Sequence, residues 1–234
     1  MKIVRWGMVG CGAVAETKSG PAYSRVAGSR LVAVASRRVS AARTYATRHC
    51  IEHVFETPDE LISSPHVDAV YIATPPSSHL ALAMRVAEAG KPCCVEKPLS
   101  MSYPEAMEMM RAFQAAGPTT LRCPLPPLSP SLRTFETLDC IGAIGDVRHI
   151  HWTLARSPKS AGVSAGGDWR TDCKEAPGGY FEDLACHGLD LFDFFVGPIS
   201  LASGVKANQQ GFNAVPDAVA ACWSHACGAT GSGL

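Results

Sequence analysis

The chain has 234 residues, enough for two domains that each bury a hydrophobic core. Lysine plus arginine and aspartate plus glutamate number 21 each, so no net charge attracts nucleic acid or an anionic membrane. Glycine, proline or a charged residue interrupts every apolar run before it could span a bilayer. We therefore expect a protein that binds neither nucleic acid nor membranes and whose partner is a small molecule.

The N-terminal residues could imitate a secretory signal, but Arg5 divides the apolar segment and the glycines that follow suit a strand and a tight turn better. The ten cysteines form neither C-x-x-C pairs nor a disulfide framework, and we interpret them as free thiols in a reducing cytosol. Cys222, His225 and Cys227 are weak candidates for metal ligands, since alternate residues of a strand simply share one face. We predict a cytoplasmic protein without a metal site.

Residues 1–122 alternate short apolar runs with helical patterns, which predicts βαβ units around a parallel sheet. The clearest strands are IVRWGMV, LVAVAS, DAVYIAT and PCCVE. Thr57 and Ser102 are each followed by glutamate at the third position, a spacing typical of helix starts, and a Gly-Pro stop signal at residues 117–118 ends the second helix. This part of the chain is predicted to be one α/β domain.

Residues 123–132 contain four prolines and are predicted to be a linker or crossover close to a domain boundary. Residues 131–141 have a helical pattern, and VRHIHWTLAR, SLASGVKANQQ and DAVAACWSHA have the patterns of strands. Residues 157–177, rich in glycine, serine and proline, are predicted to be a long loop. We assign residues 123–234 to a second domain.

Residues 178–198 have the strongest helical pattern in the chain, and a Gly-Pro pair ends it. Asp183, His187 and Asp190 share one face of this helix, which meets either solvent or a cleft. Histidine carries protons near neutral pH and a neighbouring carboxylate can fix its tautomer, but on spacing alone an ordinary surface Asp-His pair is the better explanation. On a different face we predict a buried stripe of Phe181, Leu184, Gly188, Leu191 and Phe195.

Gly10, Gly12 and Ala15 form the G-x-G-x-x-A pattern of a dinucleotide-binding turn directly after an apolar strand. The first glycine permits the tight turn, the second lets the backbone approach a pyrophosphate, and the third small residue allows helix and strand to pack closely. We predict that this turn, with Ala13 and Val14 at the start of the helix, binds the phosphates of a dinucleotide. A turn with a purely structural role is the alternative.

Ser36, Arg37 and Arg38 follow the second predicted strand, at the position where an aspartate or glutamate would bind the adenosine ribose of NAD. A hydroxyl and two guanidinium groups suit the 2′-phosphate of NADP better, because arginine pairs with phosphate oxygens. We therefore favour NADP, with NAD as the second choice. The alternative is that both arginines merely begin a solvated helix.

Glu96, Lys97 and Pro98 follow a short apolar run, near the carboxyl end of a predicted parallel strand, where such sheets bind ligands. Oxidation of a secondary alcohol by a nicotinamide requires loss of a hydride and of a proton. Lys97 could hydrogen-bond or deprotonate such a hydroxyl, Glu96 could orient the lysine, and Pro98 fixes the exit of the chain. The alternative is a charge pair at the start of a solvated loop.

The order of these motifs resembles that of the Gfo/Idh/MocA oxidoreductases, which include glucose-fructose oxidoreductase and inositol dehydrogenase. The likeness spans nearly the whole chain, through VGCGAVA, VAVASR, DAVYIATPPSSH, VEKPLS, GAIGDVR and GGYFEDLACHGLD. Its most specific part is E-K-P followed by G-G-x-x-x-D-x-x-x-H. The resemblance implies a Rossmann-type doubly wound parallel sheet, followed by an α+β domain with an open, mainly antiparallel sheet that is often used for oligomer contacts.

The resemblance also implies roles for individual residues. Lys97 corresponds to the catalytic lysine of the E-K-P motif, and Asp183 and His187 correspond to the pair that binds substrate and transfers the proton. Beyond the glycine turn and the two arginines, the residues implied to contact the cofactor are Thr74, Pro75, His79, Glu96 and Lys97.

Two departures from the family are evident. Leu125, Pro126 and Pro127 stand where close relatives usually carry a stretch with tyrosine and arginine, and we expect fewer substrate or cofactor contacts there. Family members commonly continue through more strands, whereas this sequence stops at Leu234. We expect an incomplete sheet with exposed edges, which favours a homo-oligomer formed through the C-terminal sheet.

Our leading hypothesis is an NADP-dependent oxidoreductase that transfers hydride between the nicotinamide and a secondary hydroxyl or carbonyl of a sugar, cyclitol or related diol. His187 or Lys97 takes the proton, and the two side chains are expected to converge over the nicotinamide ring. The alternative is a catalytically weak or inactive nucleotide-binding protein that serves as a sensor or assembly partner.

Overall fold

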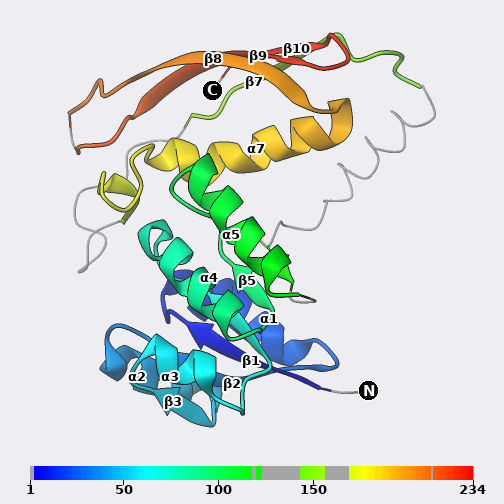
Figure 1. Ribbon diagram of the computed structural model, residues 1–234. Helices are drawn as coiled ribbons and strands as arrows, with labels where there is room; N and C mark the ends of the chain where they lie inside the picture. The colour runs from blue at the N-terminus through cyan, green and yellow to red at the C-terminus, as the bar shows by residue number, and fades with distance from the viewer. Residues whose placement is uncertain (1–2, 118–119, 123–142, 156–168, 212, 234) are drawn as a thin grey trace. The chain divides into compact units, whose positions relative to one another are not determined.

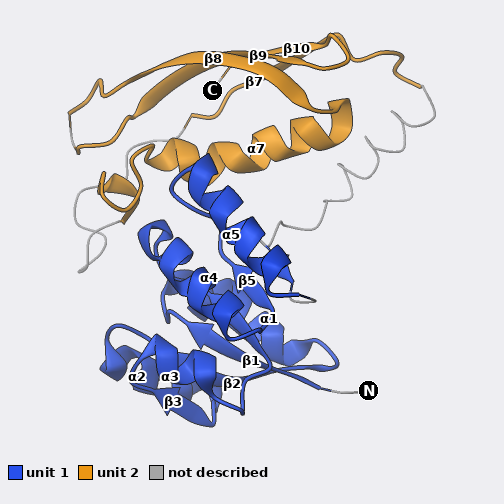
Figure 2. Cartoon of the chain, in the orientation of Figure 1, with its two compact units in different colours: residues 1–124 blue, residues 125–234 orange. Residues whose placement is uncertain are grey.

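The computed structural model contains two compact units, residues 1–124 and residues 125–234, which Figure 2 shows in different colours. None of the helices in the described part of the chain is long and apolar enough to cross a membrane. Three features predicted from the sequence lie outside the described residues: the linker, the helix at residues 131–141, and the departure at Leu125–Pro127. Most of the predicted loop also lies outside them. The described residues are 3–117, 120–122, 143–155, 169–211 and 213–233.

The first unit is built on six strands, β1 (Val4–Val9), β2 (Ser29–Ala35), β3 (His53–Phe55), β4 (Ala69–Ile72), β5 (Cys93–Val95) and β6 (Leu121–Arg122). All neighbouring strands pair in parallel, in the order β3-β2-β1-β4-β5-β6 (Figure 1). The order reverses between β1 and β4, and such a switch point is where doubly wound sheets bind ligands. The predicted Rossmann-type α/β fold is therefore confirmed.

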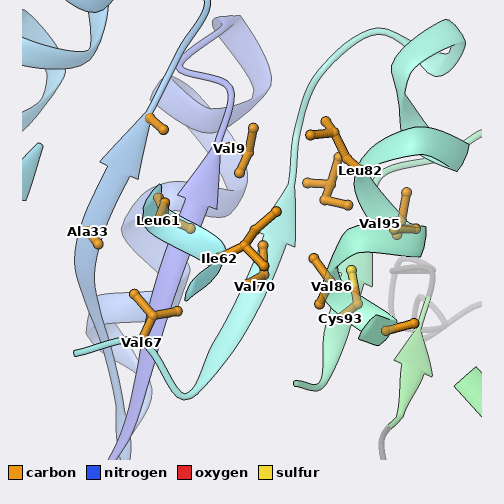
Figure 3. Close-up of a cluster of buried hydrophobic side chains, with 14 of the residues drawn as sticks. Val9, Ala33, Leu61, Ile62, Val67, Val70, Leu82, Val86, Cys93 and Val95 are labelled. Carbon is orange, nitrogen blue, oxygen red and sulfur yellow. The ribbon is translucent and has the colours of Figure 1, made fainter. Parts of the chain in front are cut away.

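Helices cover both faces of this sheet. They are η1 (Ala15–Ser19, a π-helix), α1 (Gly20–Arg25), α2 (Val39–His49), α3 (Pro58–Ser63), η2 (Pro76–Ser78, a 3-10 turn), α4 (His79–Glu88) and α5 (Tyr103–Ala115). One core cluster joins Val70 and Val95 to side chains of α3, α4 and α5 (Figure 3), and a second joins Met8 and Tyr71 to η1 and α2. Because both faces are buried, the strands are continuous apolar runs in the sequence.

Two helices of the first unit begin with the caps that the sequence predicts. The backbone N–H of Glu60 donates to Thr57 Oγ1 at 3.2 Å, and that of Glu105 donates to Ser102 Oγ at 3.4 Å. The Glu105 carboxylate in turn accepts a hydrogen bond from the Met101 backbone at 2.9 Å. The bonds to Thr57 and Ser102 satisfy donors that a helix leaves without partners in its first turn, and the bond from Met101 fixes the chain just before α5.

The second unit contains a mixed sheet of strands β7 (His149–Trp152), β8 (Ile199–Ala207), β9 (Ala218–His225) and β10 (Thr230–Gly233), with α7 (Tyr180–Val196) and the 3-10 turn η3 (Trp169–Thr171). The strand order is β7-β10-β9-β8. β10 pairs in parallel with β7 and antiparallel with β9, and β9 is antiparallel to β8. The predicted open, mainly antiparallel sheet is confirmed, and all three segments predicted as strands in this unit contain one.

Helix α7 lies against the aromatic side chains of this sheet, but along a different stripe from the one predicted. A Cβ atom at Gly188 would lie 2.6 Å from the Trp152 ring, so the helix backbone touches that indole. Phe192 stacks on Trp223, with ring centres 5.7 Å apart, and meets Trp152 edge-on at 5.6 Å. Helical spacing alone fits either stripe, and the tryptophans on the strands decide between them. Gly188 is buried as predicted. The other residues of the predicted stripe are only half-buried, namely Phe181, Leu184, Leu191 and Phe195.

Candidate functional site

The glycine turn after β1 needs its two glycines for different reasons. Gly10 has a φ of +103°, and a Cβ atom there would lie 2.7 Å from the carbonyl oxygen of Ala73. Gly12 has no atom within 4 Å of where its Cβ would be. The first glycine is therefore required by the fold itself, whereas the second keeps a space open beside the turn. That open space is what close approach of a pyrophosphate requires, so the turn fits a dinucleotide.

The helix after this turn begins at Ala13 and Val14 and then widens into the π-helical segment η1. The backbone N–H of Gly20 donates to the Ala15 carbonyl, and the hydroxyl of Tyr45 donates to the same oxygen at 3.2 Å. A Cβ atom at Gly20 would lie 2.0 Å from that hydroxyl. Single π-turns of this kind are frequent at functional sites. The sequence pattern gave no indication of this π-turn.

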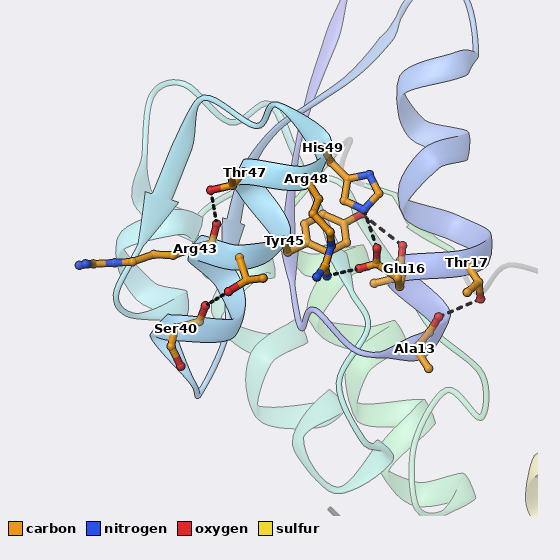
Figure 4. Close-up of polar contacts among 11 residues, drawn as sticks. Ala13, Glu16, Thr17, Ser40, Arg43, Tyr45, Thr47, Arg48 and His49 are labelled. Atoms are coloured by element: carbon orange, nitrogen blue, oxygen red, sulfur yellow. Dashed lines mark hydrogen bonds and ion pairs between the residues drawn. The ribbon is translucent and has the colours of Figure 1, made fainter. Parts of the chain in front are cut away.

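An acidic side chain, Glu16, stands in the first turn of η1, where the phosphates are predicted to bind (Figure 4). Arg48 donates to one of its oxygens at 2.7 Å, and the His49 ring lies 3.0 Å from the other. Hydrogen bonds from Arg48 and His49 lower the pKa of Glu16. The negative charge is thus paired with residues of α2, which reduces its repulsion of a bound phosphate.

Ser36, Arg37 and Arg38 lie at the carboxyl end of β2, as predicted. Ser36 is half-buried, and both arginines are exposed. Within the described part of the chain, neither guanidinium group takes part in a hydrogen bond or ion pair. Their donors are therefore available to a phosphate, and the two residues fit the proposed role.

His79 is completely buried. Its Nε2 lies 2.8 Å from the Thr74 carbonyl, and its Nδ1 lies 3.0 Å from the Pro98 carbonyl and 3.2 Å from that of Leu99. The ring therefore bridges the loop after β4 and the loop after β5. Burial lowers the pKa of His79, against the opposing effect of these carbonyl groups. Thr74 and Pro75 are half-buried in the first of the two loops.

Glu96 and Lys97 follow β5 and are both half-buried. The hydroxyl of Tyr71 donates to one Glu96 oxygen, and the backbone N–H of Lys97 donates to the other at 3.2 Å. The peptide bond between Lys97 and Pro98 is cis. Two groups therefore fix the Glu96 carboxylate directly beside the lysine. Tyr71 was not among the predicted site residues because nothing in its apolar strand marks it.

On α7, Asp183 is 5% exposed and accepts a hydrogen bond of 2.7 Å from Arg170 Nε. The Arg170 guanidinium also lies 4.3 Å from the centre of the Trp169 ring. His187 is half-buried, with its Nδ1 shielded from solvent, whereas Asp190 is exposed. Asp183 and His187 thus differ from Asp190 in their surroundings. Sequence reasoning missed Arg170, because it lies in a segment predicted only as loop.

Lys97 belongs to the first unit, and Asp183 and His187 belong to the second. The expectation that they converge on one nicotinamide ring therefore stays a prediction.

The weak metal candidate of the second unit has another explanation. His225 is 2% exposed, its Nε2 accepts a hydrogen bond of 3.1 Å from the Trp223 indole, and its Nδ1 lies 2.6 Å from the Gly197 carbonyl. Both nitrogens are therefore occupied: Nε2 within β9, and Nδ1 in tying β9 to the end of α7. Among the residues that the structure describes, no three His, Cys, Asp or Glu side chains are grouped so that they could hold a metal ion.

The parallel sheet, its switch point and the open glycine turn define a dinucleotide-binding protein of the Rossmann class. Residues 4–121 match the model of an oxidoreductase family with an NAD-binding Rossmann fold, and residues 141–233 match the GFO/IDH/MocA C-terminal domain. The chain belongs to the Gfo/Idh/MocA family of oxidoreductases. The resemblance expected from the motifs is confirmed.

Among curated proteins, the chain is 34% identical over 198 residues to Oxidoreductase P35 of Formosa agariphila, covering 84% of this chain and 61% of that protein. It is 28% identical over 192 residues to the 1,5-anhydro-D-fructose reductase of Ensifer adhaerens, covering 81% of this chain and 56% of that protein. The chain thus spans about three fifths of the length of the curated relatives it matches.

Solved structures share the fold. GenD2 from gentamicin A biosynthesis, in complex with NAD, has a TM-score of 0.88 at 23% identity over 100% of this chain and 65% of its own. KijD10, a 3-ketoreductase from Actinomadura kijaniata in complex with NADP and TDP-benzene, has a TM-score of 0.84 at 24% identity over 99% of this chain and 69% of its own. Neighbours with this fold therefore bind either nicotinamide cofactor, and the fold does not choose between them.

Proposed function

We propose that the protein is an NADP-dependent oxidoreductase acting on a secondary hydroxyl or carbonyl of a sugar, cyclitol or related diol. The single observation that carries the proposal is the open space at Gly12, in a glycine turn at the switch point of a doubly wound sheet. Family membership and the similarity to an anhydrosugar reductase support the substrate class. When bound, the cofactor accepts hydride from the substrate carbon or donates hydride to it.

The first unit supplies the cofactor contacts in this proposal. Backbone N–H groups of the turn at Gly12, Ala13 and Val14 hold the pyrophosphate at the start of a helix. Gly10, whose own N–H donates to the Ala35 carbonyl at 2.8 Å, contributes the tight turn that brings them there. Arg37 and Arg38, with the Ser36 hydroxyl, bind the 2′-phosphate, because two exposed guanidinium groups that make no hydrogen bond or ion pair among the described residues suit its charge. Thr74, Pro75 and Glu96 border the nicotinamide half, with His79 buried beneath them.

Lys97 is the proposed hydrogen-bond donor or base for the substrate hydroxyl, since it follows the carboxyl end of β5, where parallel sheets bind ligands. Asp183 binds the substrate, oriented by its ion pair with Arg170. His187 is the proposed proton carrier on α7. Within this scheme residues 1–122 are the cofactor domain and residues 123–234 the substrate domain. We further propose a cytoplasmic homo-oligomer formed through the C-terminal sheet.

The cofactor preference can be tested by titrating the tryptophan fluorescence with NADPH and with NADH. We expect Arg37→Ala and Arg38→Ala each to weaken NADPH binding about tenfold, because a charge-assisted phosphate contact is lost. NADH binding should stay unchanged. Arg111→Ala, on the exposed side of α5, is the matched control. Equal affinity of the unaltered protein for both cofactors would contradict the preference.

Catalysis can be tested by following NADP reduction with a panel of sugars, cyclitols and diols. Lys97→Met should abolish turnover with any substrate found, and NADPH binding should remain within about threefold of the starting value. Lys206→Met removes an exposed lysine of β8 and serves as the control. Turnover that survives in Lys97→Met would remove this residue from the mechanism. NADPH binding without turnover of any compound would favour a sensor or assembly partner instead.

A further inference from the structure

We propose that Tyr71 and His79 are positioning residues that hold the Glu96–Pro98 segment, and with it Lys97, from opposite faces of the sheet. The inference rests on the proposed function only for the consequence it has in catalysis. Neither residue can act on a ligand directly, since both are 0% exposed. Their polar atoms instead contact the segment on either side of the lysine.

Tyr71 supports the segment from the core formed with η1 and α2. Its hydroxyl donates to Glu96 Oε1 and also contacts Ser19 Oγ at 2.7 Å. Burial, followed by the bond to Glu96, raises the pKa of Tyr71, so the phenol keeps its proton and remains a donor. The Tyr23 ring, 4.9 Å away between centres, packs against Tyr71. A single phenol therefore connects the cofactor-binding helix to the carboxylate next to Lys97.

His79 supports the segment from the opposite face, where α4 packs over the first core cluster. Both of its ring nitrogens face carbonyl oxygens, of Thr74 on one side and of Pro98 and Leu99 on the other. A carbonyl oxygen can only accept, and a neutral imidazole has one N–H to donate. The N–H of the neutral ring thus donates to one loop at a time, either the loop after β4 or the loop after β5. The ring itself fills the space between these two loops.

Lys97 lies between these two attachments in sequence. On its N-terminal side, the Glu96 backbone N–H donates to the Ile72 carbonyl at 2.9 Å, which adds a third attachment to the sheet. A lysine side chain has four rotatable bonds, so a fixed backbone narrows the region that its amine can reach. Fixing the backbone on both sides lowers the entropy lost when the amine meets a substrate. This gives the buried pair a role in catalysis without contact with substrate.

The effect of Tyr71 can be measured without any substrate, from the pH dependence of Lys97 acylation by a small anhydride, followed by mass spectrometry. In Tyr71→Phe the Glu96 carboxylate loses its buried donor and becomes free to pair with the lysine ammonium. We expect the midpoint of the labelling profile to rise by about half a pH unit or more, because a nearby carboxylate favours the charged amine. The rise should vanish when Glu96→Gln is combined with Tyr71→Phe.

Tyr45→Phe is the matched control. It removes a buried hydroxyl bond of the same kind, from the same core cluster, without touching Glu96. It should reduce thermal stability much as Tyr71→Phe does and leave the Lys97 profile where it is. An equal shift in both variants, or a shift that persists with Glu96→Gln, would overturn the role of Tyr71.

The effect of His79 can be measured by hydrogen exchange of the backbone around residues 97–101. We expect at least threefold faster exchange in His79→Gln, with no change in the η1 segment. Unchanged exchange in residues 97–101 would overturn the role of His79. NADPH binding by the unaltered protein is measured in parallel. Absence of NADPH binding would contradict the proposed function. The labelling and exchange results would still decide whether Tyr71 and His79 position Lys97.

Discussion

The two sheets of the protein differ in how much of their surface the chain covers. In β2, the five residues from Leu31 to Ala35 are all buried, whereas in β8 every residue after Ile199 is exposed. Leu201 and Val205 of β8 are 70% and 73% exposed, although either would suit a core. In the first sheet, burial of apolar side chains determines where each strand lies along its length. The position of β8 is instead determined by its pairing with β9. Substitutions should therefore be costly in the first sheet and tolerated in β8.

The largest effect is expected at the glycine turn, where Gly10→Ala and Gly12→Ala form a matched pair. Gly10→Ala should destabilise the first unit by about 3 kcal/mol or more, since it adds an unfavourable positive φ and a clash with the Ala73 carbonyl. Gly12→Ala should change stability by only about 0.5 kcal/mol, because its Cβ meets nothing, but it should weaken NADPH binding at least tenfold. Chemical denaturation and NADPH titration separate the two effects. Equal loss of stability in both variants would contradict the assignment of the open space.

A smaller effect is expected in the second unit from Gly188→Ala. Its new methyl group would press on the Trp152 ring, and overpacking of this kind costs about 1 to 3 kcal/mol. The better helix propensity of alanine returns up to about 1 kcal/mol of this. The change should appear in the fluorescence of the second unit, which contains Trp152 and Trp223. A variant as stable as the starting protein would show that α7 can move away from the sheet.

A pH effect is expected from His79 in the first unit. Burial lowers its pKa below the ordinary 6.5 in the native state, so the unfolded chain binds the proton at higher pH. The contribution of His79 to the free energy of unfolding is therefore present above pH 6.5 and is lost as the pH falls below 6.5. The melting temperature of the unaltered protein should drop more between about pH 7 and pH 5 than that of His79→Gln. Parallel pH dependence in the two proteins would show that other groups determine the loss.

The smallest effect is expected on β8. Leu201→Thr combined with Val205→Thr should change the free energy of unfolding by no more than about 0.5 kcal/mol, because exposed side chains lose few contacts. Sedimentation velocity of the same variant tests the proposed homo-oligomer, which should dissociate more readily. A large loss of stability without change in assembly would show that β8 is covered within a single chain, contrary to its exposure.

What the sequence predicted depended on how local each signal was. The caps at Thr57 and Ser102 and the turn at Gly10 depend on residues a few positions apart, and the structure has them as predicted. Strand β3 was not among the clearest predicted strands, because its three residues, HVF, lack the continuous apolar run that marks the equally short β5. Elements with a local signature were therefore predictable from the sequence.

The contacts that support the candidate site join residues distant in sequence. Tyr71 meets Glu96 across 25 positions, and His79 meets Pro98 across 19. Arg170 pairs with Asp183 from a segment without any repeating pattern. Neither propensity nor periodicity encodes such pairs, since each depends on which strands become neighbours. Local motifs in the sequence were thus enough to propose residues that bind ligand, whereas the residues that hold them in place could not be found from the sequence.

The π-turn at η1 has a consequence for the length of this segment. Each of its hydrogen bonds spans five residues instead of four, so between Ala15 and Gly20 the chain carries one residue more than an α-helical path needs. Deleting one residue here would let the segment close as an ordinary α-helical turn without rotating the glycine-loop end of the helix, and the bond from Gly20 to the Ala15 carbonyl would be lost. A one-residue gap in this segment is consequently a change that the helix can absorb, whereas a gap in the α-helical turns that follow, in α1, would rotate one end of the helix against the other by about 100°.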